Sequence, residues 1–265
     1  YILTQMTENG QSFEDALADA QALGYAEANP TADVEGYDAM YKLSILSSMA
    51  FHAHMPIEVV YREGITKLTP ADFETARLLN YTIKLLAIGK KDGNKIEVRV
   101  HPTMIPKTHP LASVRGVFNA IFLTGHAVDD VMLYGRGAGC MPTASAVVSD
   151  IVYACHHEKR HHYMTFVNEA SMSSAVQLVQ DFICIYSIRL QVADKPGTMA
   201  AIAAAFAEQG VSLKSVIQLG EPDGVSARIT FITHAASEFA VRNALEQISA
   251  LDCVNAVESV IRVEE

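Results

Sequence analysis

An acid-rich segment that ends in a single lysine is the part of this sequence best suited to chemistry. Residues 24–42 contain one lysine, Lys42, and four acids: Glu27, Asp33, Glu35 and Asp38. Asp38 and Lys42 are four residues apart, so a helix places both side chains on one face. Carboxylates bind an ammonium group, and a lysine beside them can transfer a proton when burial lowers its pKa. The alternative interpretation of the same spacing is an exposed helical ion pair, which contributes little.

Two predicted helices flank this segment and position it. Ser12 can cap a helix from about 13 to 23, which carries acids in its first turn. A second helix is expected from about 36 to 53. Its residues from 43 to 51 are apolar on most faces, which predicts an internal helix. Lys42 would then lie at the entrance to a buried helix, where it loses its proton more easily.

The first half of the chain has the pattern of a mixed sheet with helices packed on it. Residues 81–90 and 95–101 alternate in strand fashion around an Asp-Gly turn, which predicts a hairpin. Thr69 caps a short helix that starts at Pro70 and ends at about residue 79. The later elements expected here are strands at 117–124 and 130–134 and a helix at 143–153.

A change of pattern at about residue 185 marks a second unit. Strands and helices follow at short intervals in the order β-α-β-β-α-β, which defines a ferredoxin-like fold. The expected strands are 185–192, 212–219, 225–233 and 255–263, and the expected helices are 197–209 and 236–250. We therefore expect an α+β protein with three parts: residues 1–154, a linker at 155–184, and the ferredoxin-like unit at 185–265.

Two glycine-containing turns lead from a strand into a helix. The turn at Gly135, Gly137 and Gly139 is not a dinucleotide fingerprint, because that spacing puts its third glycine where the chain has cysteine. A tight turn is the simpler interpretation, although free amides there could approach a cofactor. The turn from Asp194 to Gly197 opens the first helix of the second unit, and its amides could bind a carboxylate. A plain connection and a site for a small effector both fit that turn.

Charge, apolar runs and cysteine usage exclude several classes of protein. The 265 residues carry a net charge of −10 without a cluster of Lys and Arg, which argues against a nucleic-acid partner. No apolar run reaches the roughly 20 residues of a membrane span. The four scattered cysteines fit reduced thiols in a cytoplasmic protein. The histidines at 156, 157, 161 and 162 are interrupted by basic residues, so we expect a solvated linker and no metal site there.

Several long, spaced motifs give the chain a resemblance to two known families. Residues 1 to about 154 resemble the substrate-binding and dimerisation region of homoserine dehydrogenase, and residues 185–265 resemble an ACT domain. The motifs behind the first resemblance are Gly24-Tyr-Ala-Glu27, Pro30-Thr-Ala-Asp33, Gly36-Tyr-Asp38, Lys42, and Gly135-x-Gly-Ala-Gly139 followed by Pro142-Thr-Ala-Ser-Ala-Val. Those behind the second are Asp194-Lys-Pro-Gly197 and Val211-Ser-Leu-Lys-Ser-Val-Ile-Gln218.

The first resemblance implies NAD- or NADP-dependent interconversion of L-homoserine and L-aspartate 4-semialdehyde, a step toward threonine, isoleucine and methionine. It implies two catalytic residues, Lys42 and Asp38. The residues it implies for binding homoserine are Tyr25, Glu27, Asp33 and Asp38. The residues it implies beside the cofactor are Gly135, Gly137 and Gly139. The ACT resemblance implies feedback by an amino-acid effector, expected to be L-threonine, with Asp194 and Gly197 in its site.

The nucleotide-binding part of that family precedes the segment that begins here at Tyr1. Because the chain opens on Tyr1 and its first six residues have the pattern of a helix interior, we expect a piece of a longer protein. These 265 residues alone are therefore expected to bind little cofactor and to show no turnover. The resemblance also implies a homo-oligomer. The alternative function, from a different class, is a non-catalytic amino-acid-sensing or dimerisation module.

Overall fold

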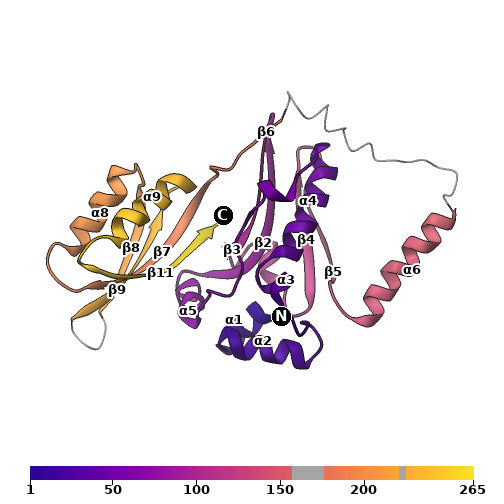
Figure 1. The fold of residues 1–265 in the computed structure, drawn as a ribbon, viewed down its shortest axis with the longest axis horizontal. Coiled ribbons are helices and arrows are strands. Elements are labelled where there is room, and N and C mark those ends of the chain that lie inside the picture. Colours follow the sequence, from indigo (N-terminus) through magenta and orange to yellow (C-terminus); the bar gives the residue numbers. More distant parts are fainter. Residues whose placement is uncertain (157–175, 221–224) are drawn as a thin grey trace.

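The computed structural model describes residues 1–156, 176–220 and 225–265 (Figure 1). Within these ranges the strands form a nine-stranded sheet and a separate two-stranded sheet. Helices pack on the larger sheet, which confirms the predicted α+β class. None of the described helices is both long and apolar enough to cross a membrane.

Four N-terminal helices contain or flank the acid-rich segment. They are α1 Ile2–Asn9, α2 Phe13–Ala22, α3 Thr31–Val34 and α4 Tyr37–Phe51. The Ser12 hydroxyl accepts a hydrogen bond from the backbone N–H of Asp15 at 3.1 Å, which confirms the predicted cap of α2. The short helix α3 lies within the acid-rich segment, between α2 and α4.

A long hairpin forms the sheet of the first half. β2 Tyr81–Asp92 and β3 Lys95–Pro106 pair antiparallel along their whole lengths, as predicted. Gly93 in the turn has φ of 58°, a left-handed conformation that glycine adopts without strain. Two short 3₁₀ helices, Ile57–Val59 and Pro110–Ser113, lie before and after the hairpin.

The other edge of β3 carries three strands from distant parts of the chain. β6 Gln177–Leu178, β1 Tyr61–Arg62 and β11 Val254–Val263 pair in parallel with the start, the middle and the end of β3. β11 also pairs antiparallel with β7 Ile183–Ala193. One continuous sheet therefore crosses from the first half of the chain into the second.

Helix α4 packs on the hairpin with one side only. A Cβ built on Gly89 of β2 would lie 2.7 Å from Ser47 Oγ and 3.3 Å from Phe51 Cε2, so glycine allows the helix to come this close. On the other side of the helix, Ile45 and Leu46 are 58% and 41% exposed. The prediction of an internal helix is therefore wrong. Apolar residues occupy two sides of α4, but the sheet covers only one of them.

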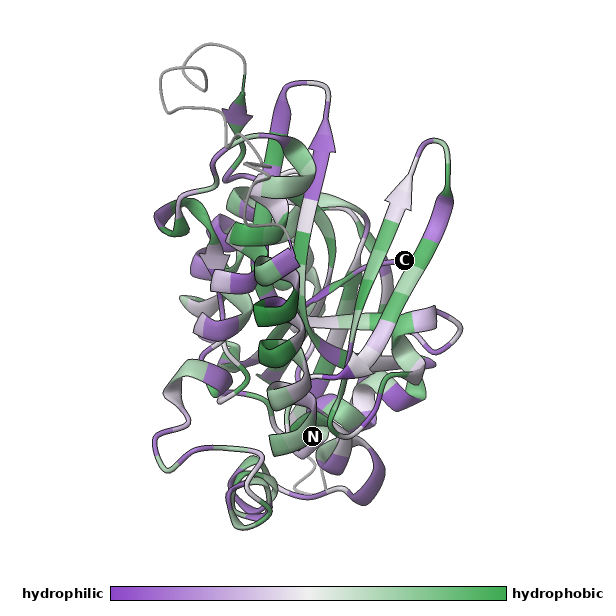
Figure 2. Ribbon diagram, turned by 90° about the vertical axis from the view of Figure 1, so that its right-hand side faces the viewer, coloured by the Kyte–Doolittle hydropathy of each residue, from purple (hydrophilic) through white to green (hydrophobic). Residues whose placement is uncertain are grey.

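A second hairpin and a helix extend from the body of the protein. β4 Phe118–Gly125 and β5 Asp129–Arg136 form the two-stranded sheet, and α6 Cys140–His156 follows, as predicted. Figure 1 shows α6 standing apart from the other helices, and in Figure 2, which views the molecule from that side, the helices facing the viewer carry many hydrophobic residues in green. Both elements present apolar side chains outward, namely Ile121, Leu123, Leu133 and Tyr134 on the hairpin and Val147, Val148, Ile151 and Val152 on α6.

The second unit has the predicted βαββαβ order. After β7 come α8 Thr198–Glu208, β8 Leu213–Gly220, β9 Ser226–Thr233, β10 Ala236–Ser237, α9 Glu238–Ser249 and finally β11. The four long strands lie in the order β11-β7-β9-β8, each antiparallel to its neighbour. Phe206 and Phe231 meet in the core with ring centroids 5.4 Å apart.

Most of the predicted linker, including three of its four histidines, lies outside the described residues. From residue 176 onward its described end contains β6 and Phe182, which is 2% exposed. The Phe182 ring contacts Tyr61 of β1 with centroids 5.5 Å apart, so this end belongs to the folded body. The four cysteines are free: Cys140 and Cys155 are exposed, and Cys184 and Cys253 are buried.

Helix α5 Pro70–Leu78 is tied to the second unit by a buried ion pair. Asp72 Oδ2 caps the helix by accepting hydrogen bonds from N and Oγ1 of Thr69 at 2.7 and 2.8 Å. Asp72 Oδ1 accepts no hydrogen bond, but it lies 2.9 Å from Nη1 of Arg189 on β7. The Asp72 and Arg189 side chains are 1% and 4% exposed. A carboxylate at this depth depends on the opposite charge beside it.

Replacing Arg189 with Met is expected to destabilise the protein by about 3–5 kcal/mol, because Asp72 stays buried without a counter-charge. Arg115 provides the matched control. Its ion pair with Glu8, at 2.9 Å, is 68% and 43% exposed and contributes less than about 1 kcal/mol. Urea unfolding of Arg189→Met, Arg115→Met and the parent protein measures the difference. Equal free energies of unfolding for the two variants would contradict this account.

Candidate functional site

The acids of residues 24–42 come together near the start of α4. Asp33 is exposed, but partial desolvation of its carboxyl still raises its pKa, and the charges of Asp38 and Glu27 raise it further. Lys42 acts on the same carboxyl in the opposite direction. The structure therefore brings four of the predicted site residues within electrostatic reach of one another. Three carboxylates around one ammonium leave the group with a net negative charge, which suits a cationic ligand.

Lys42 and Asp38 form a direct pair on the outer side of α4. The distance from Lys42 Nζ to Asp38 Oδ2 is 2.7 Å, and the side chains are 59% and 47% exposed. Asp38 lies in the first turn of α4, where the helix dipole favours a negative charge. The expectation that Lys42 is desolvated is wrong for this chain, because α4 turns this side away from the sheet. Within these residues the pair has the geometry of an exposed helical ion pair.

Residues 62–66, which the sequence analysis did not single out, hold the acid group in place. The acid group consists of Glu27, Asp33 and Asp38, which surround Lys42. Arg62 Nη1 donates a hydrogen bond to the Glu35 carbonyl oxygen and lies 3.7 Å from Glu35 Oε2. The Arg62 guanidinium also covers the Tyr37 ring, 3.8 Å from its centroid. Thr66 Oγ1 donates to Glu35 Oε1 at 3.0 Å, and Ile65 N donates to the Val34 carbonyl at 2.8 Å. Glu35 is therefore a structural anchor.

Two glycines allow this segment to pass close beneath the acids. A Cβ on Gly64 would lie 2.6 Å from the Glu35 Cα and would also collide with the Val34 carbonyl oxygen. Gly36 has φ of 78°, and a Cβ there would lie 3.3 Å from Val100 Cγ1 of β3. Both positions require glycine for physical reasons that a single sequence does not reveal.

Tyr25 and the glycine turn lie outside these polar contacts. The Tyr25 ring packs on Tyr1 with centroids 5.2 Å apart, and among the described residues its hydroxyl has no hydrogen bond to the acids. At the turn, Gly137 lies so close to the Asn119 side chain that any Cβ would collide with it. Gly139 has φ of 119° and begins the approach to α6. These features give Gly137 and Gly139 a steric role of their own, whereas a Cβ at Gly135 would meet nothing within 4 Å.

A half-buried lysine on β2 also escaped the sequence analysis. Burial lowers the pKa of Lys84, and the nearby charge of Arg115 lowers it further. Lys84 Nζ donates to the Val114 carbonyl oxygen, so the backbone holds it. Strand alternation alone does not show which lysines turn inward. In the part of the chain that the structure describes, no group of three or more His, Cys, Asp and Glu side chains could hold a metal ion.

The predicted effector turn leads from β7 into α8 and contacts β8, the edge strand of the second unit. Gly197 has φ of 95° at the N-terminus of α8. Asp194 Oδ1 accepts a hydrogen bond from Gln218 Nε2 of β8 at 3.2 Å. Thr198 Oγ1 donates to the Ala193 carbonyl at 2.9 Å. Asp194 and Gln218 belong to the two separate motifs behind the ACT resemblance, and the structure places them in contact.

Comparison with known protein families first defines the class of each unit. Residues 186–253 match the ACT domain, and residues 1–152 match the family described as homoserine dehydrogenase. The chain belongs to the homoserine dehydrogenase family and carries an ACT domain.

Named relatives and solved structures agree with this assignment. The homoserine dehydrogenases of Mycobacterium tuberculosis (strain ATCC 25618 / H37Rv) and Neisseria gonorrhoeae are 45% and 41% identical to the chain. Each match covers 100% of this chain and 62% of the relative, so the chain spans about three fifths of their length. The crystal structure of a homoserine dehydrogenase from Thiobacillus denitrificans matches with a TM-score of 0.89 at 39% identity, covering 100% of this chain and 61% of that one. The Staphylococcus aureus homoserine dehydrogenase at pH 7.0 gives 0.72 at 31%, covering 100% and 62%.

Replacing Asp33 with Asn is expected to stabilise the protein at neutral pH. The folded-state pKa of Asp33 lies above its ordinary value of 3.8, so the stability it confers falls as pH rises from 3.8 through the raised pKa. Asparagine removes this cost, so the melting temperature should rise by up to about 2 °C at pH 7, with no gain below pH 3.8. Calorimetry over this pH range checks the prediction, with Asp252→Asn as the exposed control. A lower melting temperature for Asp33→Asn at pH 7 would count against it.

Proposed function

We propose that the protein containing this chain interconverts L-homoserine and L-aspartate 4-semialdehyde with NAD or NADP, in the biosynthesis of threonine, methionine and isoleucine. Membership of the family supports the reaction. The observation that carries the proposal is the grouping of Glu27, Asp33, Asp38 and Lys42. Homoserine carries an ammonium group that the carboxylates can bind and a hydroxyl group that the lysine can contact. Both the acids and the lysine of this group therefore have a role.

The acid group binds and orients the substrate. Glu27, Asp33 and Asp38 hold the ammonium, and its charge relieves the repulsion that raises the pKa of Asp33. Lys42, held by Asp38, handles the proton on the substrate oxygen. During oxidation Lys42 takes the hydroxyl proton, and during reduction it gives a proton to the carbonyl oxygen. Tyr25 completes the substrate side of the site.

The nicotinamide cofactor supplies hydride acceptance and donation. The residues of the glycine turn fit its approach, because the turn is small and the amides of Cys140 and Met141, at the start of α6, have no acceptor within the helix. Gly135, Gly137 and Gly139 border the cofactor here. Ile45 and Leu46, exposed one turn beyond Lys42, form an apolar surface that a nicotinamide-bearing partner can cover and so desolvate the lysine.

The domains take separate roles in this proposal. Residues 1–154 form the substrate-binding and dimerisation domain, and residues 185–265 form the ACT regulatory domain. The apolar outer side of the β4–β5 hairpin supports assembly into a homo-oligomer. L-threonine is the proposed effector, with Asp194 and Gly197 in its site. The contact from Gln218 to Asp194 supports this placement, because it joins the turn to β8, which carries the second ACT motif.

Replacing Lys42 with Ala in the protein carrying its full encoded sequence is expected to lower kcat by about 10²–10⁴-fold, because proton transfer loses its carrier. Nicotinamide absorbance during homoserine oxidation measures this, with NAD and NADP tested in parallel. Lys107→Ala, an exposed lysine at the end of β3, is the matched control and should leave kcat unchanged. Retained turnover in Lys42→Ala would contradict the role of Lys42, whereas absence of turnover in the parent protein together with effector binding would favour the sensing module, the second candidate function.

L-threonine at millimolar concentration is expected to raise the melting temperature by at least about 2 °C, because a ligand that binds only the folded state stabilises it. Gly197→Ala should lose this shift, since alanine disfavours φ of 95° and the turn must rearrange. Gly210→Ala is the matched control, because Gly210 has φ of 69° in the same domain and its Cβ would also meet nothing within 4 Å. Absence of a shift in the parent protein would overturn the assignment of threonine.

A further inference from the structure

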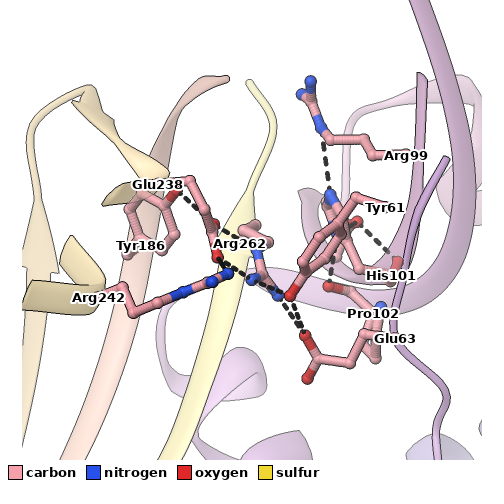
Figure 3. Close-up of polar contacts among 10 residues, drawn as sticks. Tyr61, Glu63, Arg99, His101, Pro102, Tyr186, Glu238, Arg242 and Arg262 are labelled. Atoms are coloured by element: carbon pink, nitrogen blue, oxygen red, sulfur yellow. Dashed lines mark hydrogen bonds and ion pairs between the residues drawn. The ribbon is translucent and has the colours of Figure 1, made fainter. Parts of the chain in front are cut away.

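A buried network of charged side chains lies where the ACT domain meets the first domain (Figure 3). Arg262 of β11 and Glu238, the first residue of α9, are 4% and 5% exposed. Arg262 donates to the Glu238 carboxylate through Nη2 at 2.7 Å and through Nε at 3.2 Å. Burial alone would raise the pKa of Glu238, but the hydrogen bonds and charge of Arg262 hold it below its ordinary value. The pair is therefore ionised inside the protein.

The same arginine also reaches into the first domain. Arg262 Nη2 donates to the Tyr61 hydroxyl at 2.6 Å, and Arg262 Nη1 pairs with the Glu63 carboxylate. The Tyr61 hydroxyl in turn donates to Glu63 Oε2 at 3.2 Å. The guanidinium lies over the Tyr61 ring, 4.8 Å from its centroid. Arg262 thus contacts both α9 of the ACT domain and residues 61–63 of the first domain, which we call the β1 segment, as Figure 3 shows.

Arg62 lies between the two residues that Arg262 holds. Successive side chains of an extended strand point to opposite sides, so Arg62 faces away from the network. On that side it binds the Glu35 carbonyl and covers the Tyr37 ring. Glu35 lies between Asp33 and Asp38 in the sequence, and Tyr37 directly precedes Asp38. The β1 segment therefore carries the ACT contact on one side and the acid group on the other.

We propose that Arg62 is a positioning residue for the acid group. Arg262, itself held by Glu238, fixes the segment that carries Arg62 through its contacts with Tyr61 and Glu63. Like charges repel within the acid group, so contacts among these side chains alone do not hold them together. Residues outside the group must hold them in place. Arg62 supplies that support through Glu35 and Tyr37. The consequence for catalysis rests on the proposed function, but the positioning itself can be measured without turnover.

Hydrogen exchange in the protein with its full encoded sequence tests the positioning directly. In Arg62→Gln, amides of residues 33–38 should exchange at least about fivefold faster, because the loop loses its support. Tyr61→Phe removes only the hydroxyl between Arg262 and Glu63, so it keeps the fold and should accelerate the same amides by about twofold or more. Arg115→Gln, which loses an exposed arginine, should leave them unchanged. Unchanged exchange at 33–38 in Arg62→Gln would overturn the proposal.

Steady-state kinetics of the same variants tests the consequence for the substrate. Arg62→Gln should raise the KM for homoserine by about tenfold or more while kcat stays within about threefold, since binding geometry changes but Lys42 remains. Arg62→Lys should restore only part of the loss, because lysine lacks the planar fork. A fall in kcat with unchanged KM would overturn the positioning role. If the parent protein oxidises no homoserine with either nicotinamide, the proposed function fails, and the exchange result still decides the role of Arg62.

Discussion

One edge of β3 determines how the two halves of this protein meet. β6, β1 and β11 pair there in turn, and none of them has more than two residues in register with β3. A pairing of two residues is only marginally stable by itself. Each of these pairings therefore depends on the neighbouring strands and on the side chains packed around it. Because β11 is also the last strand of the ACT domain, its register against β3 decides which ACT residues face the first domain. The first domain and the ACT domain thus share one continuous β-sheet.

The charges buried along this edge select one arrangement of the two domains. Arg99, His101 and Thr103 alternate on one face of β3 and are fully buried. Burial lowers the pKa of His101 well below its ordinary value, and Arg262 lowers it further, so the ring stays neutral and accepts from Arg99 Nε at 3.2 Å. Buried ion pairs add little over apolar packing, but separating their members is costly. Arg262 of the ACT domain pairs with Glu63 of the first domain, and Arg189 pairs with Asp72 in the same way, so a shifted arrangement would separate these partners.

Local signals made most of the helices and strands predictable. The Ser12 cap, the turn at Gly93 and the βαββαβ order are each encoded within a few residues. The burial of α4 was not predictable in this way. Its apolar content shows how much of the helix can be buried, but not how many neighbouring elements are present to cover it. The parallel pairing of Tyr61–Arg62 with β3 had no signal either, since two residues show no periodicity. The acids and Lys42 could be recognised in the sequence by their residue types and spacing. Arg62 could not, because in the sequence it looks like any exposed charged residue, and only the structure shows its contact with Glu35.

The acid group illustrates why a binding site needs support from elsewhere in the fold. Desolvation and the neighbouring carboxylates raise the pKa of Asp33, and without a cationic ligand the like charges of the group repel one another. Apolar burial offers little help, because Asp33 and Lys42 are exposed. Stability must come from the segment beneath, where Gly64 permits close approach and Arg62 binds the backbone between the acids. That segment is fixed in turn by Arg262, so the residues proposed to bind substrate are held, through Arg62 and Arg262, by the ACT domain.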